Sequence, residues 1–84
     1  MQKDTFKTKV IFLINEINED LFCFFPYENF DNKGNKTSYA HIGQHSACSL
    51  EYAKESKKAT KKQYFKLFQE LENIGYNLQI IKKF

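Results

Sequence analysis

The sequence predicts an α+β fold, in which a small antiparallel-type sheet of about four strands (β-β-β-α-β) carries one helix packed on one face. Two observations support this class. Apolar runs rich in β-branched and aromatic residues stand near both ends of the chain, which is typical of strands. Between them, residues 60–74 carry apolar side chains at helical spacing. With 84 residues, we expect a single domain spanning 1–84.

The first two strands are predicted as a β-hairpin. Residues 7–15 are rich in valine, isoleucine and phenylalanine, and the polar residues 16–20 separate them from a second apolar run over 21–26. Pro26 is expected to close this second strand, because proline cannot donate a ladder hydrogen bond. Asparagine, aspartate and glycine punctuate residues 27–36, which are expected to form a loop.

Shorter elements follow on either side of the helix. A third strand is expected over residues 37–42, ended by Gly43. Residues 46–56 are expected to hold no more than a helical turn. Residues 76–81 alternate polar and apolar side chains and predict the last strand.

The helix over residues 60–74 has signals at both ends. Thr60 and Gln63 have the spacing of a capping box, in which each side chain satisfies a free backbone amide of the other residue. Gly75 stands where a residue of positive φ belongs, and Tyr76 is expected to pack back on the helix as in a Schellman motif. The apolar stripe consists of Tyr64, Leu67, Phe68, Leu71 and Ile74.

The first two strands are apolar on both faces, whereas one helix covers only one face. Two alternatives follow for the second face. Either the loop at 27–36 folds over it, or it meets a partner, such as a second copy in a homodimer.

Positive charge is concentrated in one segment. All 13 basic residues are lysine, and six of them lie within residues 54–66 beside a single glutamate. Such a segment attracts nucleic acid, an anionic membrane or an acidic partner, although it is equally typical of a solvated face. The absence of arginine disfavours base-edge reading, so any RNA contact is expected to follow the phosphates. The candidate partner- or RNA-binding residues are Lys54, Lys57, Lys58, Lys61, Lys62, Phe65 and Lys66.

The entry to the helix is unusually basic. Lys57, Lys58, Lys61 and Lys62 crowd an end that normally favours acidic residues, and this arrangement suits a phosphate group. Phe65 lies at the edge of the apolar stripe, where it either stacks on an unpaired base or widens the core stripe.

A second candidate is the motif loop that contains both histidines. His41, His45 and Cys48 form the pattern H-x3-H-x2-C, which suits zinc, or a thiolate–imidazolium pair for catalysis. However, no CxxC pair or nucleophile elbow accompanies it, so we expect no metal, no cofactor and no enzymatic activity, and we interpret His41 as a structural residue. A small zinc- or cysteine-dependent enzyme centred on His41, His45 and Cys48 is the alternative. The candidate residues of this loop are His41, Gly43, Gln44, His45 and Cys48.

The chain is expected to be cytoplasmic and not to associate with a membrane. No apolar run approaches the length of a membrane span, and the first residues lack the apolar core of a signal peptide. Cys23 and Cys48 stand in different contexts and do not predict a disulfide framework.

Two resemblances bear on function. The segments FCFFP, SYAHIGQHSACS and KKATKKQYFKLFQELENIGYNLQI, which span about residues 21–81, resemble a group of small bacterial and mobile-element proteins with a Y-x-H-[IV]-G-Q-H motif. That resemblance implies no activity for particular residues. The chain departs from the group at Lys61 and Lys62, where a proline and acidic residues are expected.

As a short, lysine-rich and arginine-free protein, the chain also resembles the anti-CRISPR proteins of phages and prophages. This resemblance implies a non-enzymatic inhibitor of a type VI, RNA-targeting effector. The implied partners are the RNA-guided nuclease, its guide RNA, or both. The basic end of the helix would contact RNA or occupy a phosphate site, and the apolar face of the sheet would dock on protein.

Overall fold

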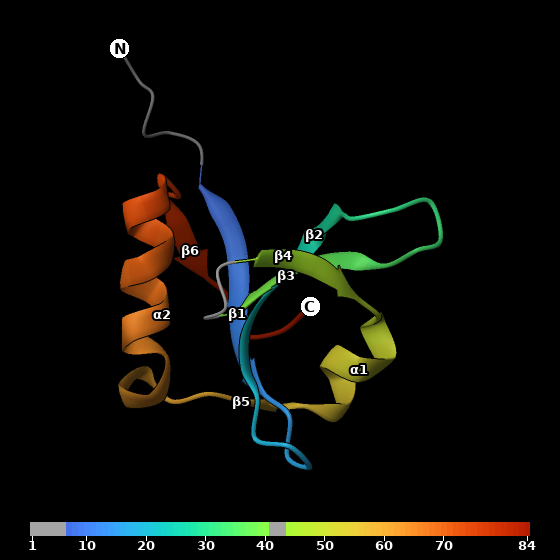
Figure 1. Ribbon diagram of the computed structural model, residues 1–84, viewed down its shortest axis with the longest axis horizontal. Coiled ribbons are helices and arrows are strands. Elements are labelled where there is room, and N and C mark those ends of the chain that lie inside the picture. Colours follow the sequence, from blue (N-terminus) through green and yellow to red (C-terminus); the bar gives the residue numbers. More distant parts are fainter. Residues whose placement is uncertain (1–6, 41–43) are drawn as a thin grey trace.

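The computed structural model describes residues 7–40 and 44–84, which form a six-stranded sheet and two helices (Figure 1). In chain order, the elements are β1 (Thr8–Ile14), β2 (Leu21–Asn29), β3 (Lys36–Ala40), β4 (Gln44–Cys48), α1 (Leu50–Glu55), β5 (Lys57–Lys58), α2 (Lys61–Ile74) and β6 (Leu78–Ile80). The α+β class is therefore confirmed. The sheet has six strands rather than the predicted four, because β4 and β5 were not foreseen.

The sheet is built around β1. Its strand order is β4-β3-β2-β1-β5, with antiparallel neighbours throughout, and β6 pairs with β1 as well. β5 lies beside Leu13 and Ile14, whereas β6 lies beside Thr8 to Val10, so the two short strands share the outer edge of β1. β6 runs parallel to β1, which departs from the expected antiparallel sheet.

The predicted β1–β2 hairpin is confirmed. The Asn15 side-chain oxygen accepts hydrogen bonds from the backbone amides of Ile17 and Asn18 and so fixes the turn. β2 continues through Pro26, contrary to expectation. Its pairing with β3 shifts register between Phe25 and Asn29, so Pro26 lies where the ladder requires no hydrogen bond from it.

The strand β4 owes its conformation to its partner. Its residues, QHSAC, are small or polar and carry no strand pattern, but they pair one by one with β3, from Lys36 opposite Cys48 to Ala40 opposite Gln44. The predicted third strand is described as far as Ala40. His41 and Gly43 lie outside the described residues.

Both ends of α2 follow the sequence signals. The Thr60 hydroxyl accepts a hydrogen bond from the Gln63 amide, and the Gln63 side chain accepts one from the Thr60 amide, which completes the capping box. Gly75 has a φ of 125°, and the Tyr76 amide donates to the Leu71 carbonyl at 3.1 Å. This Schellman arrangement is confirmed.

The face of the sheet toward α2 holds the larger core. The Phe12 ring stacks on Tyr64 with centroids 4.4 Å apart, and Phe68 packs beside them. The apolar stripe of α2 therefore covers this face as predicted, except at Ile74, which is 52% exposed and lies outside the cluster. The buried members of the cluster are Val10, Phe12, Cys23, Phe25, Tyr39, Leu67 and Leu71.

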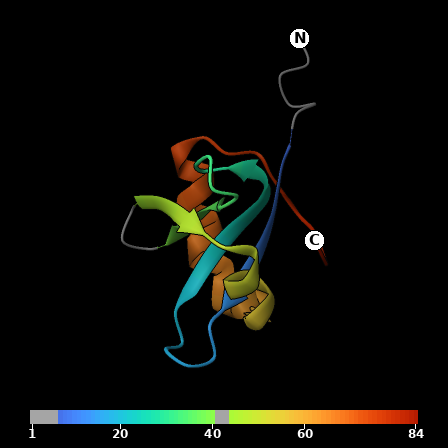
Figure 2. The same ribbon diagram turned by 90° about the vertical axis from the view of Figure 1, so that its right-hand side faces the viewer.

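The opposite face is covered by the chain itself. The helix α1 and the segment after β6 lie over it, as the view in Figure 2 shows. The buried members of this cluster are Ile11, Leu13, Phe22, Phe24, Cys48 and Ala53. The loop at 27–36 contributes none of them, so that alternative is wrong. The uncovered apolar face that suggested a homodimer is also absent from the described structure.

Candidate functional site

Two hollows open beside α1 on this second face. The smaller, which we name the lysine hollow, has a volume of about 260 Å3, and the larger, which we name the β4 hollow, has about 680 Å3. The lysine hollow is lined by Ile11, Leu13, Ala53, Lys54, Ser56, Lys58, Lys82, Lys83 and Phe84. The β4 hollow is lined by Glu19, Asp20, Leu21, Phe22, Ser38, Ala40, Ser46, Ala47, Cys48, Ser49 and Tyr52.

The pairing of β5 with β1 divides the basic segment between the two faces. Lys58 lies opposite Leu13, so its side chain points to the α1 side and lines the lysine hollow. Lys57 lies opposite Ile14 and points to the other side, where its ammonium group is 3.9 Å from the Glu16 carboxylate. Neighbouring lysines in the sequence therefore belong to different surfaces.

The segment after β6 brings two more lysines to the hollow. The Ile81 amide donates a hydrogen bond to the Val10 carbonyl at 2.9 Å, which holds this segment against β1. Lys82 and Lys83 follow directly and line the hollow with Lys54 and Lys58. Sequence reasoning missed this pair, because a local pattern does not show that the last residues return to α1.

All the charged side chains that line the lysine hollow are lysines. Its lining contains no acidic residue, and none of its four lysines forms an ion pair within residues 7–40 and 44–84. Its floor is apolar, with Ile11 and Leu13 on β1 and the Phe84 ring 5.0 Å from that of Phe24. Ammonium groups gathered over apolar surface repel one another, and an anion relieves that repulsion.

The remaining basic candidates lie on α2, away from the hollow. Lys61 and Lys62 occupy its first turn and Lys66 its second, and all three are exposed. Phe65 is also on α2 and is 47% exposed. The structure thus joins Lys54 and Lys58 with the C-terminal pair but separates them from the basic start of α2.

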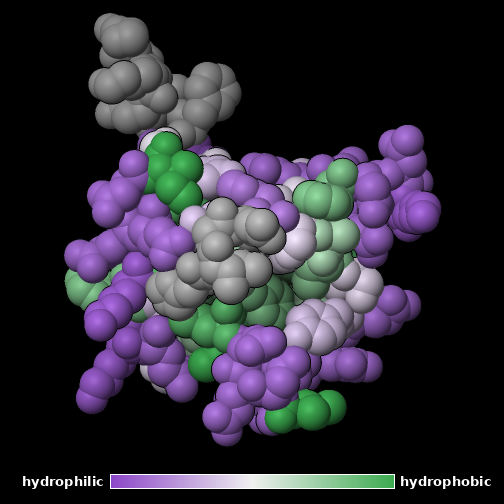
Figure 3. Space-filling view, in the orientation of Figure 1, coloured by the Kyte–Doolittle hydropathy of each residue, from purple (hydrophilic) through white to green (hydrophobic). Residues whose placement is uncertain are grey.

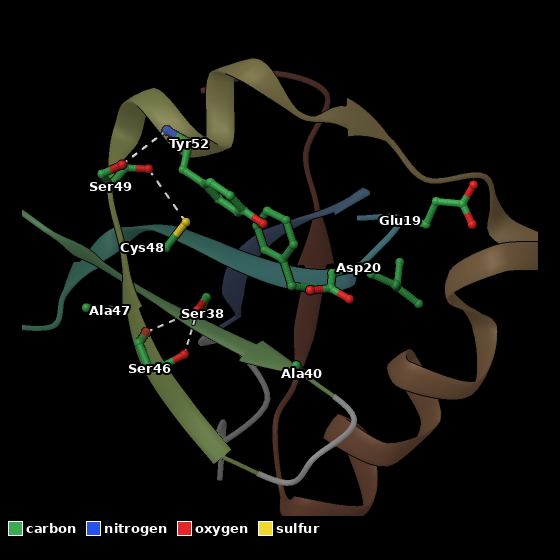
Figure 4. Close-up of a pocket in the computed structure, with 11 residues that line it drawn as sticks. Glu19, Asp20, Ser38, Ala40, Ser46, Ala47, Cys48, Ser49 and Tyr52 are labelled. Carbon is green, nitrogen blue, oxygen red and sulfur yellow. Dashed lines mark hydrogen bonds between the residues drawn. The ribbon is translucent and has the colours of Figure 1, made fainter. Parts of the chain in front are cut away.

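The β4 hollow is wider and mixed in character. Tyr52 reaches into it from α1, and its ring lies 5.5 Å from that of Phe22 (Figure 4). The Ser38 hydroxyl, on the sheet, donates to the Ser46 carbonyl at 3.1 Å. Asp20 lies across the hollow from Cys48 and Ser49 (Figure 4). In the space-filling view, apolar atoms are visible in the middle of the molecule, surrounded by hydrophilic side chains (Figure 3).

The structure separates His45 from Cys48. Cys48 faces α1 and lines the β4 hollow, whereas the His45 ring packs 4.9 Å from Tyr39 on the opposite face. The His45 Nε2 atom lies 2.7 Å from the Tyr76 hydroxyl, so this histidine has a structural partner. Residues 7–40 and 44–84 contain no group of three or more histidine, cysteine or acidic residues placed to hold a metal ion. Gln44 belongs to β4 through its backbone.

A partly buried hydrogen bond links the sheet to α2 near this histidine. The Tyr39 hydroxyl donates to a carboxylate oxygen of Glu70 at 2.6 Å. This hydrogen bond, together with burial, raises the pKa of Tyr39 to about 12. Tyr39 therefore remains a protonated donor at neutral pH and fixes β3 to the helix.

Both cysteines are held as protonated thiols. Burial raises the pKa of Cys48 to about 11, and burial raises that of Cys23 further above its ordinary value. A thiol acts as a nucleophile only as the thiolate, so neither side chain is activated at neutral pH. This geometry does not favour covalent catalysis at Cys48.

The same thiols make stability depend on pH. Unfolded thiols ionise above about pH 8.5, whereas the folded thiols stay protonated, so the unfolded state binds fewer protons there. Their contribution to stability is complete below that pH and is lost as the pH rises. In reducing buffer, we expect the free energy of unfolding in urea to fall by up to about 1.4 kcal/mol per pH unit for each thiol.

Urea titrations between about pH 8.5 and 10, below the range in which unfolded tyrosines ionise, measure that loss. In this window, a Cys48→Ala variant should retain about half of the slope, because Cys23 then remains as the thiol that contributes. A stability that is flat over this range, or a slope that the variant leaves unchanged, would contradict the assignment.

In chemical terms, the lysine hollow can hold an anionic group, and the β4 hollow offers hydroxyl, carboxylate and apolar surface. Neither helix of the described chain is long and apolar enough to cross a membrane. Comparison of the chain with protein-family models, with curated proteins and with solved structures finds no match.

Proposed function

We propose that the protein is a non-enzymatic binding protein that holds the phosphate backbone of RNA in the lysine hollow. The observation that carries this proposal is the convergence of four lysines on one apolar-floored hollow whose lining includes no acidic side chain. Lysine binds phosphate as a point charge, without reading base identity. Binding of this kind is specific to the backbone rather than to the sequence of the RNA.

A polymer fits this surface better than a single small anion does. The four lysines of the hollow come from three parts of the chain, namely α1, β5 and the segment after β6. A polyanion brings a phosphate to each of several lysines, whereas a single small anion has one charged group. The surface therefore favours an extended backbone of phosphates.

The resemblance to anti-CRISPR proteins extends the proposal to a particular partner. The RNA would be the guide of a type VI effector, and binding would block that nuclease. A tagged pull-down from cells that express the effector and its guide tests this extension, with and without ribonuclease treatment. Recovery of the effector or the guide supports it, and recovery of neither contradicts it.

The salt dependence of RNA binding tests the hollow itself. For four lysine–phosphate contacts to single-stranded RNA, we expect the logarithm of the binding constant to fall against the logarithm of salt with a slope of about −2.8. Replacing two of them, Lys54→Ala with Lys58→Ala, should reduce the steepness by about 1.4. Fluorescence anisotropy of a short labelled RNA measures both values.

A matched control is the pair Lys7→Ala with Lys33→Ala, which removes the same charge from residues that line neither hollow. We expect the slope to stay near that of the unchanged protein. Equal slopes for all three proteins, or no binding at low salt, would contradict the proposed function.

A further inference from the structure

The β4 hollow carries the opposite charge to the lysine hollow. Glu19 and Asp20 stand at one end of it, and no lysine lines it. Within residues 7–40 and 44–84, neither carboxylate forms an ion pair or a hydrogen bond. An RNA backbone would be repelled here, so the proposed RNA contact leaves this hollow unused.

The hollow has the size and lining of a binding site. Its volume of about 680 Å3 lies within the range of pockets that hold several side chains or a small ligand. The rings of Phe22 and Tyr52, which are tilted against each other, form an apolar wall, and the Ser38 and Ser46 hydroxyl groups lie 3.3 Å apart on the sheet. Such a lining accepts a chain with both apolar and polar groups.

A free strand edge runs along the hollow. β4 is the terminal strand of the sheet, and no strand of the described chain pairs with its outer side (Figure 2). Free backbone groups of this kind pair readily with an extended segment of another chain. Ser46 and Cys48 of β4 point to the hollow, so every second side chain of an added strand would enter the same space.

We infer that the β4 hollow is the docking site for an extended segment of a protein partner, which adds to the edge of β4 and places a basic side chain beside Glu19 and Asp20. The complementary charge of the two carboxylates selects a basic segment over an acidic one. This inference rests on the proposed function and deepens it. A hollow for RNA and a second hollow for a basic protein segment, both beside α1, fit a partner that is itself a protein–RNA complex.

The test uses the full chain labelled with 15N and an acetylated pentapeptide amide, Val-Ala-Arg-Ala-Val, as probe. We expect saturable NMR shifts at the amides of Ser38, Ser46 and Tyr52. A matched peptide with glutamine in place of arginine should bind about three- to fivefold more weakly, as loss of one exposed ion pair implies. Spermidine, a free polyamine without a peptide backbone, should not produce the shifts along β4.

Three variants assign the effect to the carboxylates. Asp20→Asn keeps the size of the side chain, whose oxygens have no partner to lose within the described residues, and it should weaken the preference for arginine. Adding Glu19→Gln removes the second carboxylate and should abolish the preference. Glu72→Gln removes an exposed carboxylate from α2 and should leave the preference unchanged. Equal binding of the two peptides, shifts confined to α2, or no shifts at all would overturn the inference.

Two further NMR measurements distinguish a peptide site from self-association and separate this inference from the proposed function. Shifts along β4 that depend on protein concentration without peptide would show that a second copy occupies the edge, and would overturn the inference. RNA added to the same sample should shift the amide signals of Lys82 and Lys83, which report on binding in the lysine hollow. Binding of RNA without arginine-selective binding of the peptide would reject this inference alone, whereas the reverse would reject the proposed function alone.

Discussion

Reversing the charge of the lysine hollow, with Lys54, Lys58, Lys82 and Lys83 all replaced by glutamate, is expected to lower the affinity for single-stranded RNA on the order of a hundredfold or more at moderate salt. Each substitution removes one phosphate contact and adds a repulsive charge in its place. All four side chains are exposed at the hollow, so the variant should stay folded. Anisotropy titrations measure the affinity, and thermal unfolding checks the fold.

A second variant serves as the matched control. Replacing Lys57, Lys61, Lys62 and Lys66 by glutamate changes the net charge by the same amount, but on β5 and α2 rather than in the hollow. We expect a smaller loss, of about tenfold, since only the general attraction between protein and RNA is weakened. If the control loses as much affinity as the first variant, or more, the hollow is not the binding site.

The substitution Phe12→Ala is expected to cost about 3–5 kcal/mol of stability. The Phe12 side chain is 2% exposed and stacks on Tyr64 between the sheet and α2, so truncation leaves a cavity at the centre of the larger core. Small domains are stable by only about 5–15 kcal/mol, so the loss is a large part of the total. Urea unfolding followed by circular dichroism measures it.

Phe65→Ala on the same helix is the control for that prediction. Phe65 is 47% exposed and contributes to neither buried cluster, so its truncation should cost less than about 1 kcal/mol. A comparable loss at both positions would show that the packing between α2 and the sheet is not organised around Phe12.

Elements with strong local signals were predictable from the sequence. β1 lies within the predicted 7–15, because its β-branched and aromatic residues leave no competing pattern. α2 begins after Thr60 and ends before Gly75, because the capping box and the glycine act through neighbouring residues alone. In such segments, local preference and tertiary packing agree.

Elements formed by pairing with distant residues were not predictable. The residues of β4 carry no strand preference, and their conformation comes from the ladder with β3. β5 consists of two lysines whose strand conformation depends on Leu13 and Ile14. The predicted number of strands was therefore too low, because β4 and β5 lie in segments without a local strand pattern.

The candidate site was predictable only in part, for the same reason. The basic segment was visible in the sequence, and two of its members, Lys54 and Lys58, line the hollow. The alternation of side chains along β5 sends Lys57 to the other face, which no count of charges reveals. Lys82 and Lys83 join the hollow because the chain returns to β1 after α2, a contact between opposite ends of the sequence.

The parallel pairing of β6 with β1 has a consequence for synthesis on the ribosome. Thr8 pairs with Leu78, so β1 leaves the exit tunnel long before the strand that covers the first half of its outer edge has been translated. During that interval the nascent chain exposes an apolar edge strand, the kind of surface that promotes aggregation. Contacts between residues so far apart in sequence also slow folding, because a long loop must close before they form. The sheet is therefore completed only after residues 78–80 have been made.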